Sequence, residues 1–223
     1  QAAMNAMNPV HRVNEQISEA IVTHHPGTSK EDLDRWVASL FDLVGLPKER
    51  MQDFPHQFSG GMKQRAIIAM ALACSPKLVI ADEPTTALDV VVQDQILQEI
   101  KSIQKRLNIS VIFISHDIAV VADVCHDIAV MFAGQIVEFG SREEVFASPI
   151  HPYTRLLLSS YLTLDGEKPE LLDGSGKTPK LINPPKGCRF IDQCPQAIPV
   201  CESGVPEYRD ISPTHKALCN VVS

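Results

Sequence analysis

The sequence predicts a mixed α/β fold that contains parallel strands, with a helical unit before it and a cysteine-rich tail after it. Two short apolar runs, 78–81 and 110–115, have the composition of buried parallel strands. The pattern over 90–107 predicts a helix between them, and strand, helix and strand in alternation are typical of an α/β layer. The 223 residues are 44% hydrophobic and 21% charged, which provides enough apolar material for a sizeable core.

The part of the chain before the first strand predicts a helical unit. Apolar side chains repeat at helical spacing over 13–24 and again over 33–44. A third helix is expected from the glycine pair at 60–61 to about Cys74. Residues 13–75 therefore form one helical segment in this interpretation.

The α/β pattern continues after the second strand with a short helix over 117–125. Apolar runs at 128–133 and 136–139 predict two strands, joined at Gly134 in a hairpin. Ser141, followed by a glutamate three residues later, is a capping-box pattern that begins another helix.

The character of the chain changes once more near residue 149. One more helix is expected around 153–161, followed by a linker rich in glycine, proline and lysine over roughly 166–187. We expect four segments in all, with these bounds: 1–12, 13–75, 76–148 and 149–223.

Several classes of protein are excluded by composition. No apolar run approaches the ~18–20 residues that span a bilayer, and no signal peptide is visible. A net charge of −7 argues against a surface that neutralises many phosphates, so no nucleic-acid partner is expected. Because the chain begins with Gln1 and its first ten residues read like the middle of a protein, we expect a longer parent chain.

The strongest chemical signal is a pair of carboxylates, Asp82 and Glu83, directly after the first buried strand. Ligands bind at the carboxyl edge of open parallel sheets. Asp82 suits a hard cation such as Mg²⁺, and Glu83 is placed to orient or deprotonate a water molecule. The alternative is an ordinary strand end with solvated acids. His116 follows the second strand and points toward the same edge, unless it is only a structural histidine.

The second signal is a glycine pair at the start of the third helix, in the run Ser59, Gly60, Gly61 and Met62. Backbone amides at such a helix start can approach an anion closely, although a plain glycine turn is the alternative. Lys63 and Arg65 lie in the first turn, which is unfavourable for cations, and a bound phosphate would offset that placement.

Four of the six cysteines lie close together in the tail, at Cys188, Cys194, Cys201 and Cys219. Zinc sites usually use Cys-x₂₋₄-Cys pairs, which this tail lacks, so an iron–sulfur cluster fits the spacing better. Zinc, free thiols and disulfides remain alternatives, with His215 as a substitute ligand or a bystander. The other two cysteines, Cys74 and Cys125, read as small buried hydrophobic residues.

Taken in order, these motifs resemble the nucleotide-binding subunits of ABC transporters. The run 58–62 is similar to the signature motif, with Phe and Met where the commonest form has Leu and Gln. The run 80–83 resembles Walker B with the catalytic glutamate, and 87–89, ending in Asp89, resembles the D-loop. His116 matches the switch histidine, and Gln1 falls where the Q-loop glutamine belongs. The resemblance implies a P-loop NTPase-like (RecA-like) core with an inserted helical subdomain.

The importers of dipeptides and oligopeptides are the subgroup that the chain resembles most. The runs 1–10 and 148–154 (SPIHPYT) and the cysteine-rich C-terminal extension are similar to theirs. In some members this extension holds a 4Fe–4S cluster, which implies such a cluster on Cys188, Cys194, Cys201 and Cys219 here.

One departure from the family pattern is that no Gly-x-x-x-x-Gly-Lys-Ser/Thr occurs in these 223 residues. The core is therefore incomplete as written, and the run 173–177 (DGSGK) is no substitute because it follows no strand. We expect that loop about 40–70 residues before Gln1 in the parent, a spacing taken from the family. We expect no ATPase activity from this chain alone.

The resemblance implies a mechanism for the parent protein, an ABC-type ATPase. Two subunits, identical or paralogous, enclose two ATP molecules, and the segment that begins at Ser59 contacts the γ-phosphate bound to the other subunit. Gln1 and Asp82 organise Mg²⁺ and water, Glu83 polarises the water, and His116 holds the γ-phosphate. Hydrolysis would drive transmembrane permease subunits at the cytoplasmic face of the membrane.

A substrate-binding protein would deliver dipeptides, oligopeptides or related solutes such as nickel to those permease subunits. The alternatives are a soluble non-transport ABC ATPase and a non-catalytic remnant that acts as an interaction or regulatory module. A phosphate-loop motif found upstream of Gln1 would favour the importer over the non-catalytic remnant.

Overall fold

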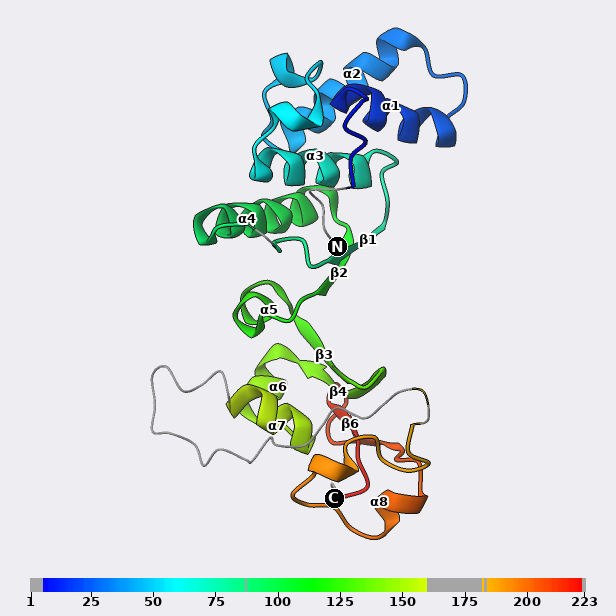
Figure 1. Cartoon of the computed structure of the whole chain (residues 1–223), viewed down its shortest axis with the longest axis vertical. Coiled ribbons are helices and arrows are strands. Elements are labelled where there is room, and N and C mark those ends of the chain that lie inside the picture. The colour runs from blue at the N-terminus through cyan, green and yellow to red at the C-terminus, as the bar shows by residue number, and fades with distance from the viewer. Residues whose placement is uncertain (1–5, 87, 160–181, 183, 222–223) are drawn as a thin grey trace. The chain divides into compact units, whose positions relative to one another are not determined.

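The computed structural model describes residues 6–86, 88–159, 182 and 184–221, and it forms two compact units (Figure 1). The first unit ends at His116 and the second begins at Asp117. The mixed α/β architecture is as expected. No helix in the described parts of the chain combines the length and the apolar character needed to cross a bilayer.

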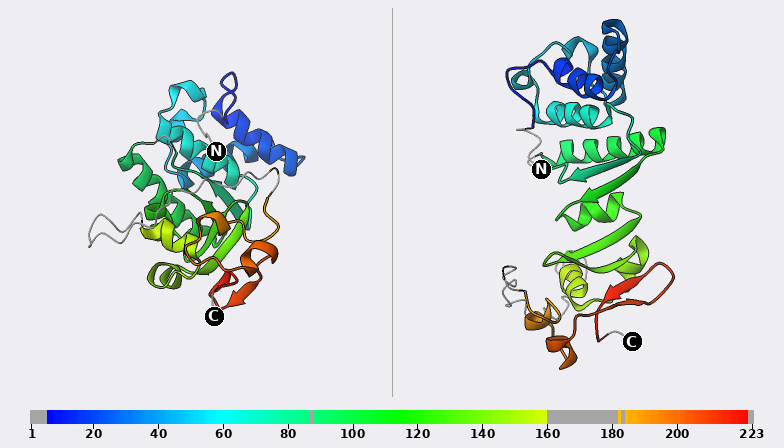
Figure 2. Two further views of the ribbon diagram at one scale, coloured as in Figure 1. Left: turned by 60° about the horizontal axis from the view of Figure 1, so that its bottom comes forward. Right: turned by 90° about the vertical axis from the view of Figure 1, so that its right-hand side faces the viewer.

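Three helices and their shared core form the beginning of the first unit (Figure 2). They are α1 (Val13–His24), α2 (Lys30–Leu43) and α3 (Gly60–Leu72), with short 3₁₀ turns at Lys48–Arg50 and Pro55–Gln57. The side chain of Ser29 accepts a hydrogen bond from the amide of Asp32 and so starts α2. Ile17 and Phe41 are fully buried between the helices. The helical pattern of the sequence is confirmed here.

The sheet of the first unit has two parallel strands, β1 (Leu78–Asp82) and β2 (Ser110–Ile114), connected by α4 (Val90–Leu107). Their parallel pairing confirms the sequence prediction. The prediction that these strands are buried is wrong for the described residues, because alternate residues of each strand are exposed. Ile80 is 63% exposed and Ile112 is 49% exposed. Within the described residues, no further strand pairs with β1 or β2.

The second unit contains a four-stranded antiparallel sheet in the order β3-β4-β6-β5. The strands are β3 (Asp127–Phe132), β4 (Gln135–Ser141), β5 (Tyr208–Asp210) and β6 (Lys216–Leu218). β3 and β4 form the expected hairpin, while the two strands from the tail were not expected from the sequence. The tail therefore completes the sheet of its own unit.

Short helices surround this second sheet. They are α5 (Ile118–Val124), α6 (Arg142–Ala147), α7 (Pro152–Ser159) and α8 (Val200–Ser203), with a 3₁₀ turn at Ile191–Gln193. Ser141 and Glu144 form the capping box that the sequence predicts at α6. Phe132, Tyr153 and Phe190 pack as an aromatic cluster with ring centroids 4.6–5.6 Å apart. Phe132 and Phe190 belong to the unit's apolar core, and Tyr153 packs against it.

Candidate functional site

The end of β1 carries the two acidic residues that the sequence singles out. Asp82 is the last residue of the strand, and Glu83 leaves it with a left-handed backbone, φ 45°. The amide of Glu83 donates to the carbonyl of Ile114 at 2.9 Å, so the ends of the two strands stay together. A non-glycine residue in this conformation is uncommon, and such residues gather at active sites.

The structure brings Glu83 and His116 together, as the sequence predicts. Nδ1 of His116 lies 3.0 Å from Oε1 of Glu83, and the hydroxyl of Thr86 donates to Oε2 at 2.9 Å. These hydrogen bonds, first that of His116 and then that of Thr86, hold the pKa of Glu83 below its usual value. The carboxylate is therefore ionised at neutral pH, as an acceptor of a proton from water must be. Thr86 belongs to the short run 85–89 that follows the acids in the sequence, but its contact with Glu83 was not predicted.

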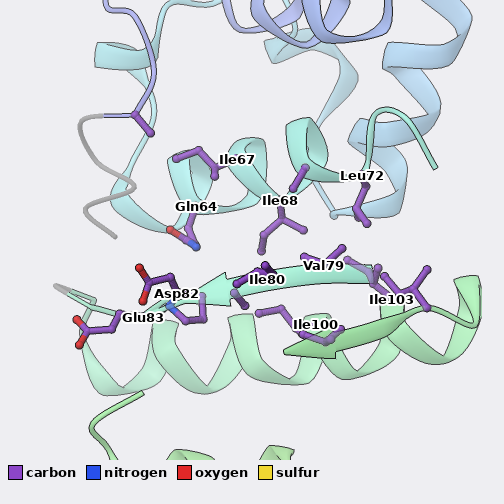
Figure 3. A pocket seen from close by; sticks show the side chains of 16 residues that line it. Gln64, Ile67, Ile68, Leu72, Val79, Ile80, Asp82, Glu83, Ile100 and Ile103 are labelled. Carbon is purple, nitrogen blue, oxygen red and sulfur yellow. The ribbon is translucent and has the colours of Figure 1, made fainter. Parts of the chain in front are cut away.

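A cavity of about 210 Å³ adjoins these acids, between α3, β1 and α4 (Figure 3). Asp82 and Glu83 lie at one end of it, and apolar side chains such as Leu72 and Ile103 line the other. Gln64 points from α3 toward Asp82 and is 6% exposed. Gln64 lies within the run that the glycine pair begins, but no role was predicted for it, although a polar residue on an otherwise apolar helix face could have indicated one. The cavity thus presents a carboxylate and an amide together, which are oxygen donors suited to a hard cation.

The glycine pair begins α3, as the sequence predicts. Ser59 is the N-cap, and its hydroxyl accepts a hydrogen bond from the amide of Met62 at 3.3 Å. A Cβ on Gly61 would lie 2.8 Å from Cγ1 of Val92, so glycine allows this helix start to approach α4. Asp89 caps α4 by accepting from the amide of Val92 at 2.9 Å. Val92 therefore contacts both Gly61, in the run similar to the signature motif, and Asp89, in the run similar to the D-loop.

Arg65 is not held in the way that the sequence analysis expects. Its guanidinium donates to the carbonyl of Val44 at 2.7 Å and forms an ion pair with Glu99 of α4. The guanidinium thus has hydrogen-bond partners within the same chain, and no bound phosphate is needed to explain its position. Burial raises the pKa of Glu99 to about 7, even though Arg65 acts in the opposite direction.

Not every expected site residue lies in the part of the chain that the structure describes. Gln1, expected to organise water and Mg²⁺, lies outside the described residues, as does Ala87 of the expected D-loop. Gly60 is the first residue of α3, where its amide is among those at the helix start.

The expectation of an iron–sulfur cluster is wrong. The structure does bring tail cysteines near one another: the amide of Cys188 donates to the carbonyl of Cys201 at 2.8 Å. Nevertheless, no group of three or more His, Cys, Asp or Glu side chains within the described residues is placed to hold a metal ion. Burial raises the pKa of the Cys188 and Cys194 thiols, and the tail thiols near these two residues also contribute to raising it. All six cysteines are free thiols.

Solved structures of ATP-binding cassettes have a fold similar to that of this chain. The cbiO1 subunit from Clostridium perfringens, part of the ABC transporter complex cbiONQ, matches with a TM-score of 0.58 and 26% identity, over 73% of this chain and 61% of that one. The cassette MJ0796, in a dimeric post-hydrolysis state bound to ADP and phosphate, matches with a TM-score of 0.56 and 26% identity, over 64% and 61%. The fold is that of an ABC ATPase cassette.

Sequence comparisons define the family more closely. The family model "ABC transporter" matches residues 2–86, and "Oligopeptide/dipeptide transporter, C-terminal region" matches residues 137–201. The dipeptide transport ATP-binding protein DppD of Haemophilus influenzae is 44% identical over 99% of this chain and 67% of its own length. DppD of Bacillus subtilis is 46% identical over 98% and 66%, and the oligopeptide transport protein OppD of Salmonella typhimurium is 44% identical over 92% and 62%.

The chain belongs to the ATP-binding subunits of dipeptide and oligopeptide ABC transporters. It spans about 62% to 67% of the length of these three relatives. The resemblance inferred from the motifs is thereby confirmed at the level of the family.

Proposed function

We propose that the protein is the ATP-binding and ATP-hydrolysing subunit of an importer that takes up dipeptides, oligopeptides or related solutes. The observation that carries the proposal is the contact of Glu83 with His116 at 3.0 Å, where two adjacent parallel strands end. An acid and a histidine at this edge can orient a water molecule and sense a phosphate. The names of the relatives support transport, and nothing favours the soluble ATPase or the non-catalytic remnant.

The roles of the residues follow from their chemistry. Glu83 accepts a proton from the attacking water, and His116 donates a hydrogen bond to the γ-phosphate. Asp82, with Gln1, would hold Mg²⁺, which supplies charge neutralisation on the phosphates when it is bound. The fit is chemically sound because Asp82 offers hard oxygen donors at the polar end of the cavity.

The segment Ser59–Met62 would complete the nucleotide site of a second, identical or paralogous ATPase subunit. The position of the Gly60 and Gly61 amides at the start of α3 and the absence of acidic residues from its first turn support binding of a phosphate there. In this proposal residues 13–75 are the helical signature subdomain, residues 1–12 the Q-loop segment, and residues 76–148 part of the ATPase core. Residues 149–223 form the C-terminal extension of the peptide importers.

The exposed face of the β1–β2 sheet is consistent with a longer protein, in which chain upstream of Gln1 carries the phosphate loop. Leu78, Ile80, Ile112 and Ile114 are 47–63% exposed, although strands of this composition are normally covered on both faces. A two-stranded sheet is also marginal by itself. Upstream chain that packs a helix on this face would cover the surface, and its phosphate loop would complete the nucleotide site.

The remaining partners and the location follow from the same family. We propose that the subunit contacts transmembrane permease subunits at the cytoplasmic face of the membrane without entering the bilayer. A separate substrate-binding protein would deliver the peptide. The match of residues 137–201 to the transporter C-terminal region supports this assignment.

The decisive experiment is Glu83→Gln in the protein that includes the upstream segment. Removing the base should lower ATP hydrolysis about 10²–10⁴-fold and leave ATP binding intact, because glutamine keeps the size and polarity of the side chain. The matched control is Glu49→Gln, an exposed glutamate of the same unit, which should hydrolyse ATP at the normal rate. Undiminished turnover by Glu83→Gln would refute the assigned role.

A further inference from the structure

Glu138 of β4 is a fully buried carboxylate that the proposed ATPase site does not use. Its two oxygens accept the amides of Ile150 and His151 at 2.9 and 2.8 Å. Nε2 of His215, 77 positions further along the chain, lies 2.8 Å from Oε1. A carboxylate in the interior is costly unless its oxygens are paired, so these three contacts make its burial possible.

The three partners come from the two ends of one segment. Ile150 and His151 stand at the beginning of the C-terminal extension, and His215 stands close to its end. All three are buried, with His151 1% exposed and His215 4% exposed. One carboxylate therefore holds both the point where the extension leaves the sheet and the point where it returns.

The strand that carries Glu138 is shaped to receive the returning segment. β6 pairs with β4 so that Glu138 is opposite Ala217. A Cβ on Gly140 would lie 2.8 Å from Cδ2 of His215, which means that only glycine leaves room for this ring. The position of the imidazole thus depends on two residues of β4, one that binds it and one that makes space.

A second carboxylate holds the loop that precedes His215. Glu144 accepts hydrogen bonds from the hydroxyls of Ser212 at 2.6 Å and Thr214 at 3.0 Å, in addition to its capping bond with Ser141. The amide of His215 donates to the hydroxyl of Ser212 at 3.0 Å. These bonds orient the loop that brings His215 to Glu138, and they show that the contact belongs to a continuous polar network.

We infer that Glu138 is an anchor that fastens both ends of the C-terminal extension to β4, with His215 as the residue that closes it. The extension is then part of the same cooperative unit as the β3–β4 hairpin and not an independently folded tail. This inference concerns docking of the extension and does not depend on the proposed ATPase activity.

The experiment is hydrogen–deuterium exchange on the full chain, followed at the amides of β6. Glu138→Gln places amide hydrogens against groups that already donate, and His215→Phe keeps a ring but donates nothing. Each change should speed exchange in Lys216–Leu218 at least tenfold. Exchange in α3, which lies in the first unit, should stay unchanged.

The controls separate the anchor from general damage. Glu202→Gln, an exposed glutamate of the same extension, should leave exchange in β6 within twofold of the unchanged protein. His215→Gln retains an Nε2 donor and should recover most of the protection. If Glu138→Gln does not fold while Glu202→Gln does, the inference is tested by comparing exchange in β6 between His215→Phe and His215→Gln.

The double variant Glu138→Gln with His215→Phe tests whether the two residues act as one contact. It should exchange no faster than the faster single variant, since the same closure is lost in each. Exchange in β6 that is within twofold of the unchanged protein after His215→Phe would overturn the inference. So would effects of the two substitutions that multiply in the double variant.

Discussion

In the first unit the β1–β2 sheet leaves apolar side chains such as Ile80 exposed, whereas in the second unit the chain's own tail extends the sheet and buries a charged group, Glu138. The first unit keeps its apolar core between helices α1, α2 and α3. The second unit builds its core from the sheet, the aromatic cluster and a polar network.

This difference teaches where each unit obtains its stability. Helices that bury one apolar face against each other are self-sufficient, so the first unit can fold around Phe41 while its sheet awaits further cover. A sheet closed by a distant segment depends on long-range contacts. Single polar substitutions in the network around Glu138 should therefore destabilise the second unit, while both units depend on the apolar side chains buried in their cores.

The largest effects should come from a matched pair of core truncations, Phe41→Ala in the first unit and Phe190→Ala in the second. Both side chains are buried, at 0% and 2% exposure, and each truncation should cost roughly 3–5 kcal/mol. Trp36 of α2 is the single tryptophan, so its fluorescence reports unfolding of the first unit. Phe41→Ala should strongly lower the denaturant concentration at which the Trp36 fluorescence changes, and Phe190→Ala should lower it little. Equal shifts would mean that the two units unfold together.

The next largest effect should be an opposite dependence on pH in the two units. Burial raises the pKa of Glu99 from 4.5 to about 7, so the folded first unit keeps a proton that the unfolded chain releases between these values. Its free energy of unfolding should therefore fall as the pH rises from 4.5 to 7. Burial lowers the pKa of His151 from 6.5 to about 4, although Glu138 attracts its charged form. The second unit should lose stability as the pH falls from 6.5 to 4.

Each of these two contributions amounts to at most about 3–4 kcal/mol, from a pKa difference of about 2.5 between the folded and unfolded chain. Denaturant unfolding at several pH values, with Trp36 fluorescence for the first unit and hydrogen exchange for the second, measures them separately. Glu99→Gln should flatten the dependence of the first unit alone. His151→Asn should flatten that of the second, because asparagine can still accept the Tyr153 amide that His151 Nδ1 accepts at 3.0 Å. Slopes of the same sign in both units would contradict the comparison.

Local patterns made much of this molecule predictable. The helical repeats, the two parallel strands, the hairpin and the contact of Glu83 with His116 follow from periodicity and from strand ends that share one edge. The return of the tail to β4 was not predictable, because His215 and Glu138 are 77 positions apart and no local rule links them. The metal prediction for the cysteines failed for the same reason, since spacing along the chain does not fix how side chains converge.

The smallest effect should come from Ile80→Thr, and it tests the exposed sheet directly. Ile80 is 63% exposed, so in the chain of residues 1–223 this substitution should change the free energy of unfolding by less than about 0.5 kcal/mol. In the protein that includes the upstream segment, the same substitution should cost roughly 1–3 kcal/mol, because a covered isoleucine is replaced by a polar side chain. Val79→Thr, on the covered face, is the control and should be destabilising in both forms. Equal effects of Ile80→Thr in the two forms would show that the sheet face stays open to water, and the incomplete sheet would then be a property of the protein itself.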